Sequence, residues 1–211
     1  DHSQEIYERL GVKLTPQDVY AESAYNPDLA PMVESLKKAG KAQEHEGALC
    51  IFMDEFVGKD GQALPLIIQK NDGGFLYAST DLAALRYRTQ RLHGNKLLYV
   101  VDARQALHFQ QIFAAGRKIG FLPEDVETTH ISFGMVLDKS GKPFKSRDGG
   151  VTKLRDLLDE AISRAKNLIA EKNPEMDAAE LATIANAVGI ASVKYADLSK
   201  NRTTDYVFDW D

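Results

Sequence analysis

The alternation of short apolar segments with longer amphipathic ones between Phe75 and Leu137 most narrowly limits the folds open to this chain. The expected elements, in the order strand, helix, strand, helix, strand, are Phe75–Ala78, Asp81–Leu92, Lys96–Asp102, Gln105–Ile119 and Thr128–Leu137. The second strand is almost entirely apolar, which is typical of a strand buried on both faces. Strands joined through helices form parallel sheets, so this region predicts half of a nucleotide-binding α/β fold.

The segments before this region have a different pattern. A helix is expected from Asn26-Pro27, where Asn can cap and Pro fits the first turn, to Gly40. Strand-like runs at 49–56 and 64–69, with turn-forming residues after each, predict antiparallel hairpins.

Two helices are expected after residue 150. The first has apolar residues at helical spacing and ends near Asn173-Pro174, and the second spans about 178–198 with small residues on one face.

In the earlier region of alternating strands and helices, Ser79 or Thr80 is the expected cap of the helix that begins at Asp81.

Composition narrows the class of protein further. The 211 residues include 26 Lys plus Arg, 31 Asp plus Glu and 44% hydrophobic residues, which excludes disordered and collagen-like chains. The single cysteine, Cys50, fits a reducing compartment, and no apolar run is long enough to span a bilayer. We therefore expect a soluble cytoplasmic protein with no membrane partner. Because the chain begins at Asp1 and stops at Trp210-Asp211, we also expect it to be a piece of a larger protein.

Polar residues follow each of the three predicted strands. In parallel sheets ligands collect beyond the carboxyl ends of the strands, so we expect these side chains to converge. They are Tyr77 and Asp81, then Asp102, Arg104 and Gln105, then Gly134, Lys142 and Lys145.

The segment from Asp138 to Arg155 carries six Lys and Arg against two Asp. A cationic loop bounded by glycines suits a phosphate clamp, which would stabilise charge developing on pyrophosphate. A solvated basic loop is the alternative. It is not a Walker loop, since Pro143 follows Gly141-Lys142 where Ser or Thr is required.

The other candidate residues also have two interpretations. Asp81 could bind a guanidinium through two parallel hydrogen bonds, or could merely complement a helix dipole in the first turn. Gln105 could be an ordinary first-turn residue and Asp102 an N-cap. His108 and His130 could lie near a nucleotide or be structural. The five histidines have no metal-ligand spacing, so no metal site is expected.

Beyond these patterns, the amino-acid sequences of two segments resemble those of a known family. Phe133-Gly134-Met135-Val136-Leu137 and the following 141–147 (GKPFKSR) resemble the second signature of class I aminoacyl-tRNA synthetases, in the form found in arginyl-tRNA synthetases. The general signature is Lys-Met-Ser-Lys-Ser. Here both lysines and the last serine are kept at Lys142, Lys145 and Ser146, and the two middle positions differ.

The resemblance extends along the chain. The segment 77–84 is similar to the family's arginine-recognition segment, and 101–105 to the segment that supplies a glutamine. The stretches 186–195 and 201–206 resemble the link toward the anticodon-binding domain. It implies that Tyr77 and Asp81 hold the guanidinium of arginine and that Gln105 positions this substrate. It also implies that Phe133, Gly134 and Met135 meet adenine, that Lys142 and Lys145 are catalytic toward pyrophosphate, and that Ser146 helps bind ATP.

The resemblance further implies an architecture and a reaction. The chain would be the C-terminal half of a Rossmann-like parallel nucleotide-binding fold, preceded by a small α+β insertion and followed by helices. Residues 1–73 would be the connecting insertion, 74–150 the second half of the catalytic domain, and 151–211 the helical region leading to the anticodon-binding domain. The partners would be L-arginine, ATP with Mg2+ as substrate, and tRNA(Arg), in a monomeric full-length enzyme with no tightly bound metal.

One departure from the family pattern limits what this chain can do alone. The first class I signature, His-x-Gly-His, is missing, since His45-Glu46-Gly47 and His93-Gly94-Asn95 do not fit it. We therefore expect the isolated chain not to catalyse adenylation. The alternatives that stay open are another class I synthetase and a non-catalytic nucleotide-binding or RNA-binding module.

Overall fold

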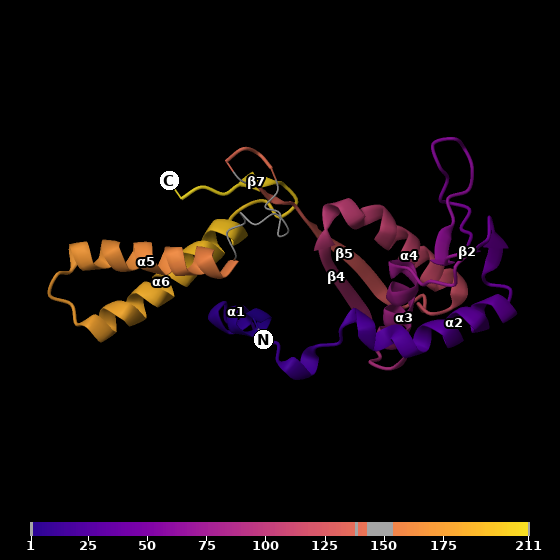
Figure 1. Ribbon diagram of the computed structural model, residues 1–211, viewed down its shortest axis with the longest axis horizontal. Coiled ribbons are helices and arrows are strands. Elements are labelled where there is room, and N and C mark those ends of the chain that lie inside the picture. Colours follow the sequence, from indigo (N-terminus) through magenta and orange to yellow (C-terminus); the bar gives the residue numbers. More distant parts are fainter. Residues whose placement is uncertain (1, 138, 143–153, 211) are drawn as a thin grey trace. The chain divides into compact units, whose positions relative to one another are not determined.

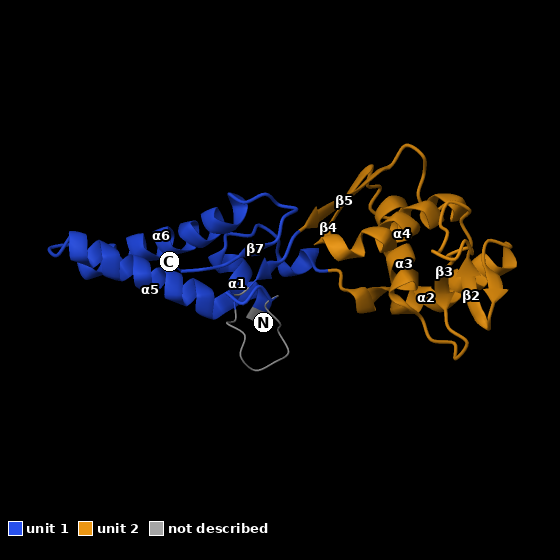
Figure 2. Cartoon of the chain, turned by 90° about the horizontal axis from the view of Figure 1, so that it is seen from above, with its two compact units in different colours: residues 1–19, 134–211 blue, residues 20–133 orange. Residues whose placement is uncertain are grey.

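The computed structural model describes residues 2–137, 139–142 and 154–210. The chain divides into two compact units, one formed by 1–19 together with 134–211 and the other by 20–133 (Figure 2). In the described residues no helix is both long enough and apolar enough to cross a membrane.

The second unit opens with a 3-10 turn, Glu22–Tyr25, that leads into helix α2, Asn26–Lys38. The predicted start at Asn26 and the apolar face are confirmed, because Leu29, Val33 and Leu36 are all buried. The helix is closed as expected near Gly40, whose φ of +67° is a conformation that favours glycine.

An antiparallel sheet follows, with β1 (Gln43–His45), β2 (Ala48–Ile51) and β3 (Leu66–Gln69) in that order. The turn between β1 and β2 places Glu46 and Gly47 at φ of +50° and +79°, as a two-residue hairpin of matching twist requires. The predicted hairpin strands are confirmed, although each is shorter than its apolar run.

Helix α3, Tyr77–Gln90, corrects the prediction for its region. The expected strand Phe75–Ala78 is wrong, since Phe75 makes only an isolated bridge to Gln69 and the helix already begins at Tyr77. The first turn is buried against β3, where the Ser79 hydroxyl donates a hydrogen bond to the carbonyl of Ile68. A short apolar run cannot be assigned to strand or helix by periodicity alone, and here tertiary packing decides it. The expected cap at Ser79 or Thr80 is also wrong, because Leu76 occupies that position.

The parallel sheet contains β4 (Lys96–Asp102) and β5 (Glu127–Phe133), which pair along their whole length. Helix α4, Ala106–Ile119, joins them and lies close to both strands in Figure 1. The predicted second strand and second helix are therefore confirmed. The third expected strand, Thr128–Leu137, is interrupted at Gly134, and β6 (Val136–Leu137) pairs instead with β7 (Tyr206–Val207) in the first unit.

Only one face of β4 is covered by the described residues. Leu97 and Tyr99 point into the core shared with α2, α3 and α4, whereas Leu98 and Val100 are 52% and 65% exposed. The prediction that this strand is buried on both faces is wrong for the chain as described, because the described helices pack on a single side of the sheet.

The first unit is mainly helical. It contains α1 (His2–Arg9), a 3-10 turn (Pro16–Asp18), α5 (Leu154–Lys172) and α6 (Ala178–Leu198). The two predicted C-terminal helices are confirmed. They approach closely at Gly189, where an added Cβ would lie 2.7 Å from the backbone of Ile162. Arg9 on α1 forms a 2.6 Å ion pair with Asp159 on α5.

The crossing of α3 and α4 gives a testable prediction. Leu85 is fully buried, and an added Cβ on Gly116 would lie 2.3 Å from its Cδ2 atom. We expect Leu85→Ala to lower the free energy of unfolding by about 2–5 kcal/mol, and the exposed control Leu98→Ala by less than about 0.5 kcal/mol. Chemical denaturation followed by circular dichroism measures both.

The same contact predicts a dependence between two substitutions. Gly116→Ala should destabilise the native chain by overpacking against Leu85 but should cost less in the Leu85→Ala background. Additive effects of the two changes would contradict the proposed close approach of the helices.

Candidate functional site

A cavity of about 370 Å³ in the second unit contains three of the residues predicted from the sequence. Tyr77, Asp81 and Gln105 all line it, although they come from different elements. The other lining residues are Tyr20, Glu22, Tyr25, Thr80, Ala84, Arg88, Val101, His108 and Phe109. Pockets of this size that combine aromatic walls with a few polar groups are typical of small-molecule sites.

Helix α3 supplies two of the three predicted residues. Tyr77 and Asp81 are four residues apart on it and therefore lie on one helical face. Tyr77 is 74% exposed, and the Asp81 side chain is 30% exposed. The first turn of α3 contains no acidic residue, so the alternative role of Asp81 as a first-turn partner of the helix dipole is wrong.

Gln105 reaches the cavity from the carboxyl end of β4. The strand ends at Asp102, a 3-10 turn covers Ala103–Gln105, and Gln105 is the residue that precedes α4. Its side chain makes no capping hydrogen bond.

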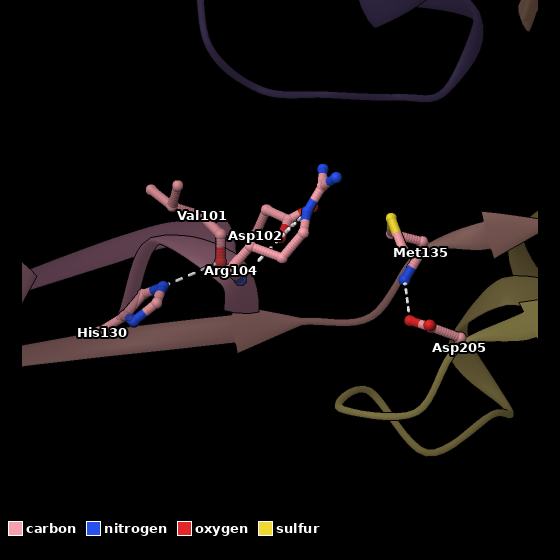
Figure 3. A network of polar contacts seen from close by, with 6 residues as sticks. All are labelled: Val101, Asp102, Arg104, His130, Met135 and Asp205. Atoms are coloured by element: carbon pink, nitrogen blue, oxygen red, sulfur yellow. Dashed lines mark hydrogen bonds and ion pairs between the residues drawn. The ribbon is translucent and has the colours of Figure 1, made fainter. Parts of the chain in front are cut away.

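Asp102 has the capping role that was one of its two interpretations. Its carboxylate accepts hydrogen bonds from the backbone N–H of Arg104 at 2.8 Å and from the Arg104 guanidinium at 2.8 and 2.9 Å (Figure 3). Hydrogen bonds from this guanidinium, and then from the backbone, hold the pKa of Asp102 below its usual value.

Reasoning from the sequence named His108 but missed its contact with Asp81, and it did not find Glu22. His108 Nε2 lies 2.6 Å from Asp81 Oδ2, and Glu22 adds a second carboxylate to the cavity lining. The spacing of Gln105 and His108, three residues apart at the start of a helix, could have indicated that they share a face. Nothing in the local sequence around Glu22 connects it with Asp81, because tertiary packing brings both into the lining of one cavity.

Aromatic residues form one wall of the cavity. The ring of Tyr20 stacks on that of Tyr87 at 4.4 Å and meets that of Tyr25 edge-on at 5.0 Å. Burial raises the pKa of Tyr25. The guanidinium of Arg88 lies over the ring of Tyr99, 5.0 Å from its centroid, in a cation–π contact.

His130 contacts the backbone of the neighbouring strand. Its Nε2 donates to the carbonyl of Val101 at 3.0 Å, between the two paired strands β4 and β5 (Figure 3). Within 2–137, 139–142 and 154–210 no group of three or more His, Cys, Asp and Glu side chains could hold a metal ion.

The predicted adenine segment spans the boundary of the two units. Phe133 ends β5 in the second unit and is 38% exposed. In the first unit the Gly134 N–H donates to the carbonyl of Arg202 at 2.8 Å, and the Met135 N–H donates to Asp205 Oδ1 at 2.6 Å (Figure 3). The loop around Asp205 therefore fixes the backbone of Gly134 and Met135.

Tyr206 anchors the same loop. Its hydroxyl donates to Asp197 Oδ1 at 2.8 Å, and its N–H donates to the carbonyl of Met135 at 3.0 Å. Burial, together with the hydrogen bond to Asp197, raises the pKa of Tyr206 to about 12.

The basic loop lies mostly outside the described residues. Lys142 is described and is exposed in the first unit. Lys145 and Ser146, predicted to act on pyrophosphate and ATP, lie outside the described residues. Their roles stay predictions.

Comparison with known proteins identifies the family. Residues 1–210 match the family model described as tRNA synthetases class I (R), catalytic domain. The chain belongs to this family. The family resemblance inferred from the sequence is thereby confirmed.

Relatives and solved structures of the class I (R) synthetases agree with this assignment. The chain is 59% identical over 210 residues to an arginine–tRNA ligase of Marinomonas and 56% identical over 209 residues to one of Escherichia coli. The two alignments include 100% and 99% of this chain, and 36% of each relative. An arginyl-tRNA synthetase structure from Plasmodium falciparum matches all of the chain and 34% of that protein, with a TM-score of 0.81 and 29% identity.

A second solved structure supports the fold alone. The arginyl-tRNA synthetase of Thermus thermophilus matches 86% of this chain and 35% of that chain with a TM-score of 0.67 at 17% identity. The chain thus spans about a third of the length of the class I (R) synthetases that it matches.

The contact of Gly134 with the 201–206 loop gives a second prediction. An added Cβ on Gly134 would lie 2.5 Å from the carbonyl carbon of Thr204 and 2.7 Å from the Asp205 nitrogen, both backbone atoms that cannot rotate away. We expect Gly134→Ala to displace this loop and to expose the Met135 amide to faster hydrogen exchange.

Asp205→Asn is the matched control because it keeps an Oδ1 acceptor for the Met135 N–H. It should preserve most of the protection of that amide. Unchanged exchange at Met135 in Gly134→Ala would contradict the close approach.

Proposed function

We propose that this chain is part of an arginine–tRNA ligase, which activates L-arginine with ATP and transfers it to tRNA(Arg). Membership of the class I (R) family supports the reaction, and the cavity shared by Tyr77, Asp81 and Gln105 supports the substrate. The observation that carries the proposal is that these three side chains line one cavity of about 370 Å³ together with a second carboxylate, that of Glu22.

Arginine would be recognised through its guanidinium. Asp81 would accept two parallel hydrogen bonds, Glu22 would add negative charge, and the hydroxyl of Tyr77 would complete the contact. Gln105 would position the amino acid from the end of β4. A planar fork of donors fits such a carboxylate, whereas the compact ammonium of lysine cannot form the same paired contact.

Activation would take place at the carboxylate of arginine. An oxygen of this group attacks the α-phosphorus of ATP, which is bound with Mg2+ as substrate. The bond from the α-phosphorus to the bridging oxygen breaks, and pyrophosphate leaves with the electron pair. Lys142 and Lys145 would stabilise the charge that develops on pyrophosphate, and Ser146 would help to hold ATP. A hydroxyl of the terminal ribose of the tRNA then attacks the carbonyl carbon of the adenylate, the bond to the phosphate oxygen breaks, and AMP leaves.

Adenine would meet the backbone of Phe133, Gly134 and Met135. The Gly134 and Met135 N–H groups already donate within the first unit, to Arg202 and Asp205. The Met135 carbonyl also accepts a hydrogen bond, from the Tyr206 N–H. Any adenine contact at these two residues would therefore use the Gly134 carbonyl or the second acceptor position of the Met135 carbonyl. The 201–206 loop would hold the adenine segment in place rather than touch the nucleotide.

The finer architecture belongs to the same proposal. Residues 74–150 would be the C-terminal half of a Rossmann-like fold, with 1–73 as the connecting insertion and 151–211 as the helical region toward the anticodon-binding domain. The parallel pairing of β4 with β5 supports this arrangement, as does the exposure of Leu98 and Val100, which another part of a longer protein would cover. The full-length enzyme would be a cytoplasmic monomer, and the chain alone would not adenylate arginine because it has no His-x-Gly-His signature.

The proposal predicts the effect of removing Asp81. In the full-length polypeptide that contains this chain, Asp81→Ala should weaken arginine affinity by about 2–5 kcal/mol, which raises the KM for arginine roughly 30-fold or more. The KM for ATP should change little. ATP–pyrophosphate exchange at varied arginine and ATP concentrations measures both.

Glu124→Ala is a suitable control, because that side chain is 90% exposed in the same unit. An unchanged KM for arginine in Asp81→Ala would favour another class I synthetase specificity. A full-length protein that activates no amino acid would favour a non-catalytic nucleotide-binding or RNA-binding module.

A further inference from the structure

Asp81 is held from one side by a histidine on a neighbouring helix. His108 on α4 places its Nε2 atom 2.6 Å from Asp81 Oδ2 on α3, and the two side chains are 27% and 30% exposed. Both residues line the cavity that contains Tyr77 and Gln105. We infer that His108 is a positioning residue, which fixes the Asp81 carboxylate in the orientation that receives a guanidinium. The inference rests on the proposed role of Asp81 in arginine binding.

The direction of the hydrogen bond follows from the partners. An ionised carboxylate only accepts hydrogen bonds, so Nε2 of His108 carries the hydrogen and donates it to Oδ2. A carboxylate offers about four acceptor positions, two on each oxygen. One hydrogen bond from His108 therefore leaves both oxygens able to accept the two parallel bonds of a guanidinium.

Orientation matters because the paired contact is planar. The terminal torsion of an aspartate side chain has a broad distribution, so an unheld carboxylate samples many planes. A guanidinium forms both bonds only when the two planes agree. Fixing Oδ2 selects one orientation before the substrate arrives, which reduces the cost of ordering on binding.

His108 is itself fixed by the core. Its ring meets the ring of Phe109 edge-on at 5.2 Å, and Phe109 is 4% exposed and packs against Tyr99 at 5.1 Å. His108 lies in the first turn of α4, three residues after Gln105. The start of this helix thus presents one proposed substrate contact and the residue that holds another.

The other charged groups of the cavity do not replace this contact. An ionised Glu22 carboxylate has no hydrogen to donate to Asp81, and the guanidinium of Arg88 lies over the ring of Tyr99. Among the described residues, His108 is the hydrogen-bond partner of the Asp81 side chain.

The test compares three substitutions in the full-length enzyme. The Nε2 atom of glutamine is four bonds from Cα, as is Nε2 of histidine, whereas the amide nitrogen of asparagine is only three bonds away. His108→Gln can therefore donate to Asp81, while His108→Asn cannot reach it and His108→Phe has no donor.

We expect His108→Phe and His108→Asn to raise the KM for arginine about tenfold or more, as loss of a hydrogen bond to a charged group does. The KM for ATP should stay within roughly twofold, and His108→Gln should restore the KM for arginine to within about threefold of the unaltered enzyme. ATP–pyrophosphate exchange measures the KM for arginine and the KM for ATP of each variant, and circular dichroism checks that each variant folds. If His108→Phe does not fold, the comparison of Gln with Asn decides.

Measuring Asp81→Ala in parallel tests the role of His108 separately from the proposed binding of arginine by Asp81. A raised arginine KM in Asp81→Ala with none in His108→Asn would overturn the role of His108 and leave the proposed function intact. An equal effect of Gln and Asn, or a parallel rise in the KM for ATP, would make His108 merely structural. An arginine KM that does not respond to Asp81→Ala would overturn both.

Discussion

The burial of helix α3 is the constraint on which the candidate site depends. Leu82 and Leu85 are fully buried, the Ser79 hydroxyl is bonded to the carbonyl of Ile68 on β3, and Leu85 fills the space left by Gly116 on α4. With these contacts fixed, the helix cannot rotate about its axis. Its remaining face, with Tyr77 and Asp81, is directed at the cavity. Packing on one side of a helix thus determines the chemistry available on the other.

The sequence predicted that Tyr77, Asp81 and Gln105 would lie near one another, although it misjudged the local structure around the first two. Tyr77 and Asp81 were expected to converge across the end of a strand, and they share a cavity because they lie four residues apart on a helix. Gln105 was expected at the end of β4 and is found there. Apolar runs of four residues do not distinguish strand from helix, which explains the wrong assignment of 75–78.

Long-range contacts lay beyond the reach of sequence patterns. The hydrogen bond between His108 and Asp81 joins two helices, and Glu22 enters the cavity from a turn far away along the chain. The interruption of the expected strand Thr128–Leu137 at Gly134 also results from a long-range contact. Its cause is the backbone of Thr204 and Asp205, which approaches so closely that only glycine fits. Such contacts connect segments that share no periodicity, so local propensity gives no sign of them.

The central claim is that Asp81, held by His108, binds a guanidinium. A crystal structure of the full-length enzyme with bound L-arginine tests it most directly. The account predicts two guanidinium nitrogens within about 3.2 Å of the two Asp81 oxygens, with the His108 contact retained. A guanidinium bound elsewhere, or one that displaces His108 from Asp81, would contradict it.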